Sequence, residues 1–151
     1  MDSPVGRLVM LTSKKGISGV YFGHRIEKST LPPESSKNLI LKKAARQLEE
    51  FFAKKRESFD LPLEAKGSAF QRSIWRELSK IPFGQTRSYG DLADAIGNPK
   101  AVRAVGLANG ANPISIIVPC HRVIGKNGAL VGFGGGLEIK TKLLKHEGLL
   151  L

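Results

Sequence analysis

A capping box and closely spaced helix stops divide the second half of this chain into short helices. Ser68 and Gln71 stand three residues apart, and in such a box the hydroxyl and amide side chains satisfy each other's backbone donors. This box predicts a helix that runs to about Lys80 and ends at the Pro82-Phe83-Gly84 stop. The second half is therefore predicted to be mostly helical and to be built from short segments.

Two further helices are predicted on either side of a tight turn. Ser88 can cap a helix over residues 89–96, which Gly97 ends. Asn98, with Pro99 at the first helical position, predicts another helix that runs to about residue 109. Such a pair is typical of a helix-turn-helix. Small side chains on the second helix would let it approach a nucleic-acid groove, but ordinary helix packing explains them equally well.

The first 65 residues carry the pattern of a small α/β lobe. The expected elements are strands over residues 5–11 and 16–22, a helix over residues 38–53 and a further strand over residues 59–63. The predicted fold class is thus α/β followed by α. A short antiparallel sheet with a helix forms an N-terminal lobe over residues 1–65, and a mostly helical domain with the helix-turn-helix follows over residues 66–151.

The chain is strongly basic. It contains 24 Lys and Arg against 13 Asp and Glu, a net charge of +11. Such an excess favours a polyanionic partner, with nucleic acid the first candidate, although a solvated basic surface would look the same. The ratio of basic to acidic residues is largest in the C-terminal third. From residue 99 onward there are seven Lys and Arg residues but only two acidic ones, Glu138 and Glu147.

Several classes of protein are excluded or disfavoured by composition. No apolar run approaches the roughly 20 residues that a membrane span needs, and the N-terminus lacks the pattern of a signal peptide. A single cysteine allows no internal disulfide and no zinc site with two thiolates. We expect no metal, no cofactor and no membrane partner, a monomeric protein, and a reducing location, most simply the cytoplasm, with association to the nucleoid in a prokaryote.

The only cysteine stands in the string Pro119-Cys120-His121-Arg122, directly after an apolar run at residues 114–118. A thiol delivered by an apolar segment into a basic, glycine-rich stretch is placed for chemistry, yet free cysteines are also among the most buried residue types. The glycines at 132–136 lack the spacing of a nucleotide phosphate site. A final helix is expected over residues 137–147, with His146 and Glu147 at its C-terminal end.

Together these strings resemble one family closely. The resemblance rests on Tyr89, Arg103, Asn112-Pro113, Pro119-Cys120-His121-Arg122-Val123, the glycine-rich loop and His146-Glu147-Gly148. The chain is similar here to the O6-alkylguanine-DNA alkyltransferases, also called methylated-DNA–protein-cysteine methyltransferases. The match covers about residues 70–148, and the first half fits the family's small lobe by its pattern and its Ser3-Pro4-Val5-Gly6 opening.

The resemblance implies direct reversal of DNA damage by a suicide enzyme. The substrate would be O6-alkylguanine in duplex DNA, chiefly O6-methylguanine, with O4-methylthymine as a second candidate. The damaged base would be rotated out of the duplex, and the Cys120 sulfur would take the alkyl group irreversibly, once per molecule. By resemblance His121 accepts the thiol proton through a water, Glu147 stabilises the imidazolium, and Asn112 bridges backbone groups between the helix-turn-helix and the cysteine segment.

The resemblance also places residues around the DNA and the extruded base. Arg103 would enter the minor groove and fill the space of the flipped base, and Tyr89 would press on the phosphate backbone and donate to the purine. Backbone groups at Val123 and Gly134 would read the guanine edges. Phe133 and Gly134 stand where some members have tyrosine and serine, which predicts a wider and less polar pocket. Our own additions, made without the resemblance, are Asn98 and Lys126 as phosphate contacts.

Three other functions are compatible with parts of the sequence. A non-catalytic alkyl-lesion-binding protein would share the fold, but it commonly has tryptophan at the cysteine position. A thiol hydrolase would use Cys120 and His121, although adjacent residues rarely aim both side chains at one point. A helix-turn-helix regulator would leave Cys120 structural and would bind DNA by sequence.

Overall fold

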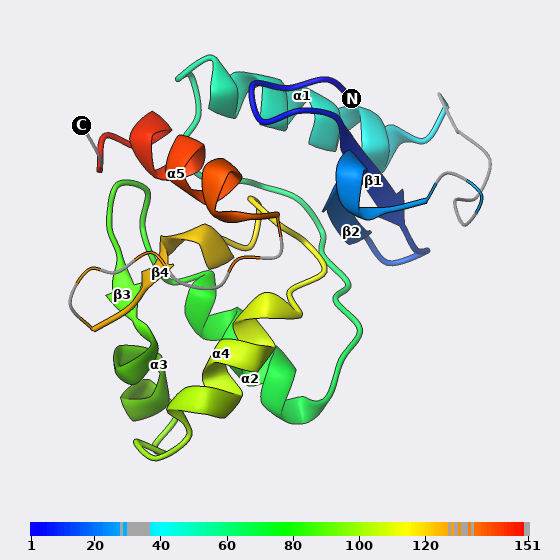
Figure 1. The fold of residues 1–151 in the computed structure, drawn as a ribbon. Coiled ribbons are helices and arrows are strands. Elements are labelled where there is room, and N and C mark those ends of the chain that lie inside the picture. Colours follow the sequence, from blue (N-terminus) through cyan, green and yellow to red (C-terminus); the bar gives the residue numbers. More distant parts are fainter. Residues whose placement is uncertain are drawn as a thin grey trace.

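The N-terminal lobe is a two-stranded antiparallel sheet with one helix beside it (Figure 1). The structure is a computed structural model that describes residues 1–27, 29, 37–126, 128, 130, 133 and 135–149. Strand β1 (Leu8–Thr12) pairs with β2 (Ile17–Phe22), with Leu8 opposite Phe22. β1 begins later than predicted, because residues 3–6 form a turn in which the Gly6 N–H donates to the Ser3 carbonyl at 3.0 Å.

Helix α1 (Leu39–Phe52) matches the predicted amphipathic helix closely. The Asn38 side chain caps it by accepting from the Leu41 N–H at 3.0 Å. Its buried residues recur at helical spacing and face the core; they are Ala44, Gln47, Leu48 and Phe51. The Gln47 amide exchanges two hydrogen bonds with the Asp60 backbone, at 3.0 and 2.9 Å, and so ties the segment after α1 back onto the helix.

The strand predicted at residues 59–63 is wrong. Only one residue pair there forms a bridge, Leu63 with Ile17 of β2. The Ile17 N–H donates to the Pro62 carbonyl at 2.8 Å, and the Glu64 N–H donates to the Ile17 carbonyl at 2.7 Å. Pro62 has no N–H to extend this pairing, which limits the contact to a bridge.

The second half is mostly helical, as predicted. Its elements are α2 (Ala69–Leu78), β3 (Arg87–Ser88), α3 (Tyr89–Ala95), α4 (Val102–Gly110), a 3₁₀ turn (Cys120–Arg122), β4 (Val123–Ile124) and α5 (Leu137–His146). Ser68 and Ser88 form capping boxes with Gln71 and Asp91, so both predicted helix starts are confirmed. α2, α3 and α4 pack against one another below α5 (Figure 1). Among the described residues no helix has the length and apolar character needed to cross a membrane.

The predicted start of the helix-turn-helix's second helix, at Pro99, is wrong by three residues. α4 begins at Val102 rather than at Pro99, and its N-cap residue, Ala101, makes no side-chain capping bond. The Asn98 carbonyl instead accepts from the Ala101 N–H at 2.9 Å, which closes a turn with Pro99 at its second position. Proline is favoured there, so the turn competes successfully with helix initiation.

The cysteine segment joins the two halves of the chain. Residues 114–118 are all buried, as the apolar run predicted, and they lie against β2 rather than forming a strand of their own. The Val20 N–H donates to the Pro113 carbonyl at 2.9 Å, and the Ser115 N–H donates to the Val20 carbonyl at 3.2 Å. One hydrophobic core therefore continues from the N-terminal sheet through this segment to the helices.

Candidate active site

Cys120 opens a short 3₁₀ turn deep in the molecule. The residue is 4% exposed, and its N–H donates to the Val118 carbonyl at 2.8 Å. Two residues before that carbonyl, Ile116 has a φ of 72°, a left-handed conformation that a β-branched residue rarely adopts. The segment thus combines tight packing with a strained backbone, a combination that is common at functional sites.

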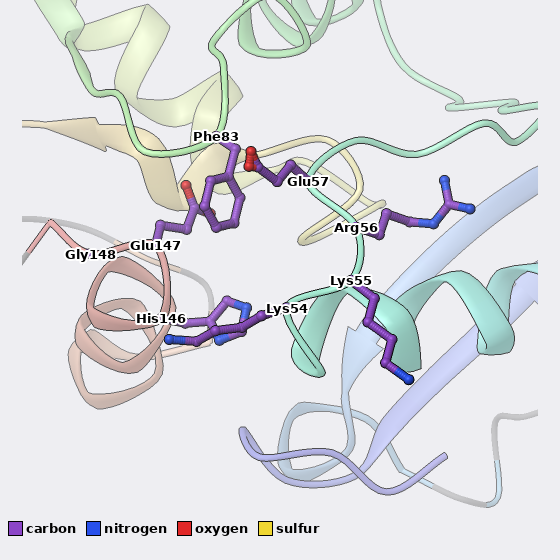
Figure 2. Close-up of a pocket in the computed structure, with 8 residues that line it drawn as sticks. All are labelled: Lys54, Lys55, Arg56, Glu57, Phe83, His146, Glu147 and Gly148. Atoms are coloured by element: carbon purple, nitrogen blue, oxygen red, sulfur yellow. The ribbon is translucent and has the colours of Figure 1, made fainter.

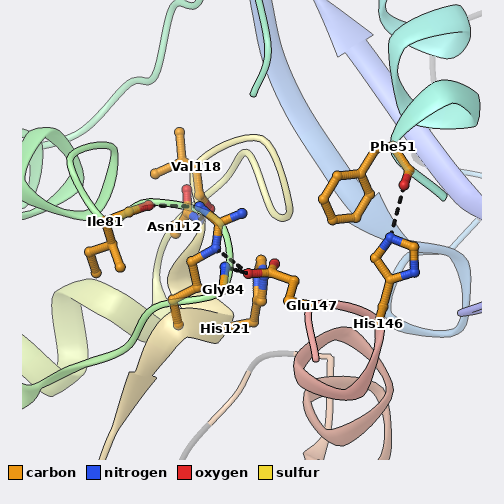
Figure 3. Close-up of polar contacts among 9 residues, drawn as sticks. Phe51, Ile81, Gly84, Asn112, Val118, His121, His146 and Glu147 are labelled. Atoms are coloured by element: carbon orange, nitrogen blue, oxygen red, sulfur yellow. Dashed lines mark hydrogen bonds and ion pairs between the residues drawn. The ribbon is translucent and has the colours of Figure 1, made fainter. Parts of the chain in front are cut away.

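The Asn112 side chain makes three hydrogen bonds to the backbone of this segment. Its Nδ2 donates to the Val118 carbonyl at 2.8 Å (Figure 3). Nδ2 also lies 3.5 Å from the Ile114 carbonyl, and Oδ1 accepts from the Ile114 N–H at 3.0 Å. These bonds hold the segment in its turn. The link from α4 to the cysteine comes from Asn109, whose Nδ2 approaches the Cys120 carbonyl at 3.4 Å.

A buried carboxylate organises three segments next to the cysteine. Glu147 follows α5, and its Oε2 lies 2.5 Å from His121 Nε2, with both side chains 0% exposed. Its Oε1 accepts from Arg122 Nε at 2.8 Å and from the Gly84 N–H at 2.9 Å (Figure 3). Arg122 is fixed in turn by donating to the Ile81 carbonyl at 2.7 Å. His121 and Glu147, which are 26 positions apart in the sequence, are thus brought into direct contact, and Cys120 directly precedes His121 in the chain.

The protonation states of this pair follow from its surroundings. Burial alone would raise the pKa of Glu147, but hydrogen bonds and charge from His121, with hydrogen bonds from Arg122 and Gly84, outweigh it and lower the pKa to about 2. Burial lowers the pKa of His121, and Glu147 opposes this only in part. A neutral imidazole then donates Nε2–H to the carboxylate. Its Nδ1, which is buried and has no hydrogen-bond partner among the described residues, keeps a lone pair.

The thiol itself is protonated at rest. Burial raises the pKa of Cys120, and a hydrogen bond from Asn112 and the nearby charge of Lys140 oppose the shift without reversing it. A protonated thiol is a poor nucleophile, so the site needs a base to remove its proton. The neutral His121 beside it is the residue in this site with a free nitrogen lone pair.

Lys140 is a buried cation that sequence reasoning missed. It is 0% exposed, and its Nζ donates to the Val123 carbonyl at 2.5 Å. Burial lowers the pKa of Lys140 to about 8, against the opposing effect of a Cys120 thiolate. A signal was present in the sequence, because Lys140 falls in the apolar stripe of α5 with Leu143 and Leu144, where a lysine is unexpected.

Other contributors were missed because their partners are far apart in the chain. Gly84 and Glu147 are separated by 63 positions, and Arg122 and Ile81 by 41. Arg122 was part of the cysteine motif, but the sequence assigned it no role. Asn109 looked like the end of a helix.

Tyr89 and Arg103 lie on the helix-turn-helix. Tyr89 is the half-buried first residue of α3, and the parallel pairing of β3 with β4 sets Ser88, just before it, opposite Ile124. Burial raises the pKa of Tyr89, and so does the negative charge of an ionised Cys120, while a hydrogen bond with Asn109 opposes the shift. Arg103 is exposed on α4. Four residues on, Leu107 is 73% exposed, so this face of α4 offers an apolar surface beside its cation.

The remaining predicted residues differ in their surroundings. Val123 is buried, and its carbonyl accepts from Lys140. Phe133 is half-buried and packs on Phe22 of the N-terminal lobe with ring centroids 5.7 Å apart. Asn98 and Lys126 are exposed, but Asn98 lies in a turn and not at the helix start that suggested a phosphate contact. Gly134 lies outside the described residues.

A pocket lies on another side of Glu147 (Figure 2). It is lined by Lys54, Lys55, Arg56, Glu57, Phe83, His146, Glu147 and Gly148. Cys120 and Tyr89 are not part of its lining, so it is separate from the thiol. Within the described part of the chain no group of three or more His, Cys, Asp or Glu residues could hold a metal ion.

Comparison with known proteins gives a consistent picture over the whole chain. Two sequence families match: the 6-O-methylguanine DNA methyltransferase DNA binding domain over residues 69–149, and the ribonuclease-like domain of the same methyltransferases over residues 1–65. A methylated-DNA–protein-cysteine methyltransferase from Methanosarcina acetivorans is 49% identical over 148 residues, which cover 97% of this chain and 95% of that protein. The constitutive enzyme of that name from Bacillus subtilis is 43% identical over 151 residues, covering 97% and 92%.

Solved structures agree with the sequence matches. The crystal structure of Mycobacterium tuberculosis OGT in complex with DNA superimposes with a TM-score of 0.89 at 42% identity, covering 99% of this chain and 92% of that one. An O6-methylguanine DNA methyltransferase from Methanococcus jannaschii gives a TM-score of 0.70 at 28% identity, covering 95% and 89%.

Proposed function

The chain belongs to the 6-O-methylguanine DNA methyltransferase family, and we propose on that premise that it repairs DNA by transferring an alkyl group from O6-alkylguanine to Cys120. The observation that carries this assignment to particular residues is the buried His121–Glu147 pair beside the only cysteine, with His121 Nδ1 available as a base. The activity is that of a methylated-DNA–protein-cysteine methyltransferase.

The proposed reaction is a single displacement. His121 Nδ1 takes the thiol proton through a water, and Glu147 stabilises the imidazolium that results. The Cys120 sulfur attacks the alkyl carbon, so that an S–C bond forms while the C–O6 bond breaks. The electron pair of the broken bond stays with the base, which takes up a proton and becomes guanine. A thioether is chemically stable, and none of these residues can cleave it, which supports single turnover.

The burial of Cys120 supports base flipping. At 4% exposure its thiol cannot reach O6 of a guanine stacked inside a duplex. The damaged nucleotide must therefore leave the stack and enter the protein. Tyr89 at the start of α3 would contact the extruded purine, with Val123, Phe133 and Gly134 around it, and Lys140 would hold the Val123 carbonyl in place. Asn112 would keep the cysteine turn in shape.

The exposed face of α4 is the proposed DNA surface. Arg103 and the apolar Leu107 stand on it, and the small residues Ala104 and Gly110 are exposed nearby, so the helix can approach the minor groove closely. Lys126 is proposed as an additional phosphate contact, and Asn98 as a weaker one since it does not cap a helix. We also propose that the protein acts as a monomer in the cytoplasm, or at the nucleoid in a prokaryote, and that its lobe and domain divide at residues 65–66, close to where the two family matches meet.

The first test is the intact mass of the protein after incubation with duplex DNA that contains one O6-methylguanine. We expect one added methyl group, mapped to the peptide that carries Cys120, in stoichiometric and irreversible yield. An unmodified protein that still binds the lesion would instead indicate a lesion-binding protein. Equal binding to undamaged DNA of one sequence, without modification, would indicate a regulator.

Replacing Arg103 with alanine tests the proposed DNA face. We expect the rate of methyl transfer at saturating DNA to fall by about tenfold or more, because the few kcal/mol needed to unstack a base are then less well compensated. Lys100→Ala is the matched control, since Lys100 is exposed in the preceding turn and should affect affinity alone. A lower salt dependence of binding in Arg103→Ala, with an unchanged transfer rate, would assign Arg103 to a phosphate contact instead.

A further inference from the structure

One histidine outside the proposed relay connects the end of α5 to the end of α1. His146 Nε2 lies 2.8 Å from the Phe51 carbonyl, although the two residues are 95 positions apart (Figure 3). Since a carbonyl can only accept, the histidine donates Nε2–H. Phe51 belongs to the last turn of α1, where helix carbonyls carry partial negative charge and favour such a donor.

Aromatic packing fixes the same ring on several sides. The His146 ring centroid lies 4.8 Å from that of Phe51, 5.7 Å from Phe52 and 6.2 Å from Phe83. Phe83 directly precedes Gly84, the residue whose N–H binds the Glu147 carboxylate. The ring is therefore held by the N-terminal lobe on one side and by the loop that contacts Glu147 on the other (Figure 2).

The residue after His146 is the acid of the proposed relay. Glu147 lies just past the last turn of α5, where a helix normally frays, yet its carboxylate must stay within 2.5 Å of His121 Nε2. We propose that His146 is a positioning residue, which holds the Glu147 carboxylate in place for His121 by anchoring the end of α5 to the Phe51 carbonyl. This inference rests on the proposed function and gives the N-terminal lobe a part in the chemistry.

Four charged residues lie near His146 in the same pocket. Lys54, Lys55, Arg56 and Glu57 line the pocket that His146 also lines. Arg56 is engaged with Glu50 at 3.2 Å and with the Ser58 carbonyl at 3.0 Å. Among the described residues, the recorded side-chain hydrogen bond between α5 and α1 is the one from His146 to the Phe51 carbonyl.

Two variants distinguish the effect of the His146–Phe51 hydrogen bond from the effect of side-chain size. The His146→Gln amide nitrogen reaches about as far from the backbone as Nε2 and can donate to Phe51, whereas the amide of His146→Asn is one bond shorter and cannot. Both are polar, uncharged and close in size, so they are matched for folding. The readout is the rate at which iodoacetamide alkylates Cys120, measured without DNA across the pH range in which cysteine and histidine titrate.

We expect His146→Asn to react about tenfold more slowly at neutral pH, with the midpoint of its pH profile moved upward, because a displaced Glu147 stabilises the His121 imidazolium less well. His146→Gln should restore most of the rate and the wild-type midpoint. DNA affinity should be unchanged in both. Iodoacetamide needs no DNA, so this assay is independent of the methyl-transfer test. If the three proteins gave the expected pH profiles but the wild type transferred no methyl group, the proposed function would be overturned and the positioning role of His146 would stand.

Phe59→Leu provides the control for a merely structural role. Phe59 packs on Phe51 at 5.5 Å in the same aromatic cluster, so its replacement loosens the lobe without removing the His146 donor. We expect it to lower the melting temperature and to leave the pH profile in place. Identical profiles in wild type, His146→Asn and His146→Gln would overturn the proposal, as would a shift in Phe59→Leu as large as that in His146→Asn.

Discussion

Replacing Cys120 with serine is expected to abolish methyl transfer and to leave binding of the damaged duplex intact. The hydroxyl is close in size to the thiol, so the packed segment around residue 120 should fold as before. A serine hydroxyl is far less acidic than a thiol, and the neutral His121 cannot ionise it to a useful extent. Removal of a catalytic nucleophile lowers rates by factors on the order of 10⁶, which here means loss of all detectable transfer.

The measurement is the intact mass of Cys120→Ser after incubation with the O6-methylguanine duplex, beside a titration of its affinity for the same DNA. Ser73→Ala is a suitable control, because the Ser73 hydroxyl lies on α2, where it donates to the Phe70 carbonyl at 2.6 Å and not to the cysteine segment. A methyl group found on Cys120→Ser protein would show that another side chain accepts it. Ester or peptide turnover by the wild type that disappears in the variant would favour a thiol hydrolase instead.

Replacing Glu147 with glutamine is expected to slow transfer by roughly a hundredfold and to destabilise the protein. The amide keeps the shape but removes the charge that stabilises a His121 imidazolium, and general base catalysis contributes about 10²–10⁴-fold. Arg122, whose side chain is 6% exposed, loses its counter-charge as well. Breaking one partner of a buried pair costs about 3–5 kcal/mol, which denaturant titration measures directly.

The same variant should change how stability depends on pH. The pKa of Glu147 is about 2 in the folded protein, against 4.5 as its ordinary value. A depressed pKa contributes stability that is complete above the ordinary value and is lost as the pH falls towards the folded one. Acid unfolding of Glu147→Gln should therefore be flatter in this window.

Glu138→Gln is the matched control for these measurements. Glu138 lies on α5, the helix that precedes Glu147, but its side chain is exposed and pairs with Lys142 only at 3.6 Å. We expect neither its transfer rate nor its acid unfolding to differ from wild type. A Glu147→Gln protein with both properties unchanged would remove the carboxylate from the mechanism.

Local signals accounted for the parts of the fold that were predicted well. The boxes at Ser68 and Ser88 work through bonds within one helical turn, so sequence spacing is enough to find them. The error at Asn98 arose because the same residues favour two local structures, a helix cap and a proline turn, and the turn formed. The error at residues 59–63 arose because strand pairing depends on the partner, and only Leu63 found one.

The sequence named the residues of the candidate site but not their arrangement. The family resemblance supplied Cys120, His121 and Glu147, and nothing in their spacing shows that two of the side chains meet. The partners that fix them, including Gly84 and Lys140, act through single hydrogen bonds between distant segments. Such bonds leave no periodic trace in a sequence, with the partial exception of a lysine on an apolar helix face.

The only tryptophan of the chain lies between two helices of the DNA-binding half. Trp75 is 5% exposed, and its indole Nε1 donates to the Ala108 carbonyl of α4 at 2.9 Å. α4 also carries Arg103 on its exposed face. The protein therefore contains a single tryptophan, hydrogen-bonded to the back of its proposed docking helix. Excited selectively over the tyrosines, its emission wavelength can follow movement of α4 on DNA without any attached label.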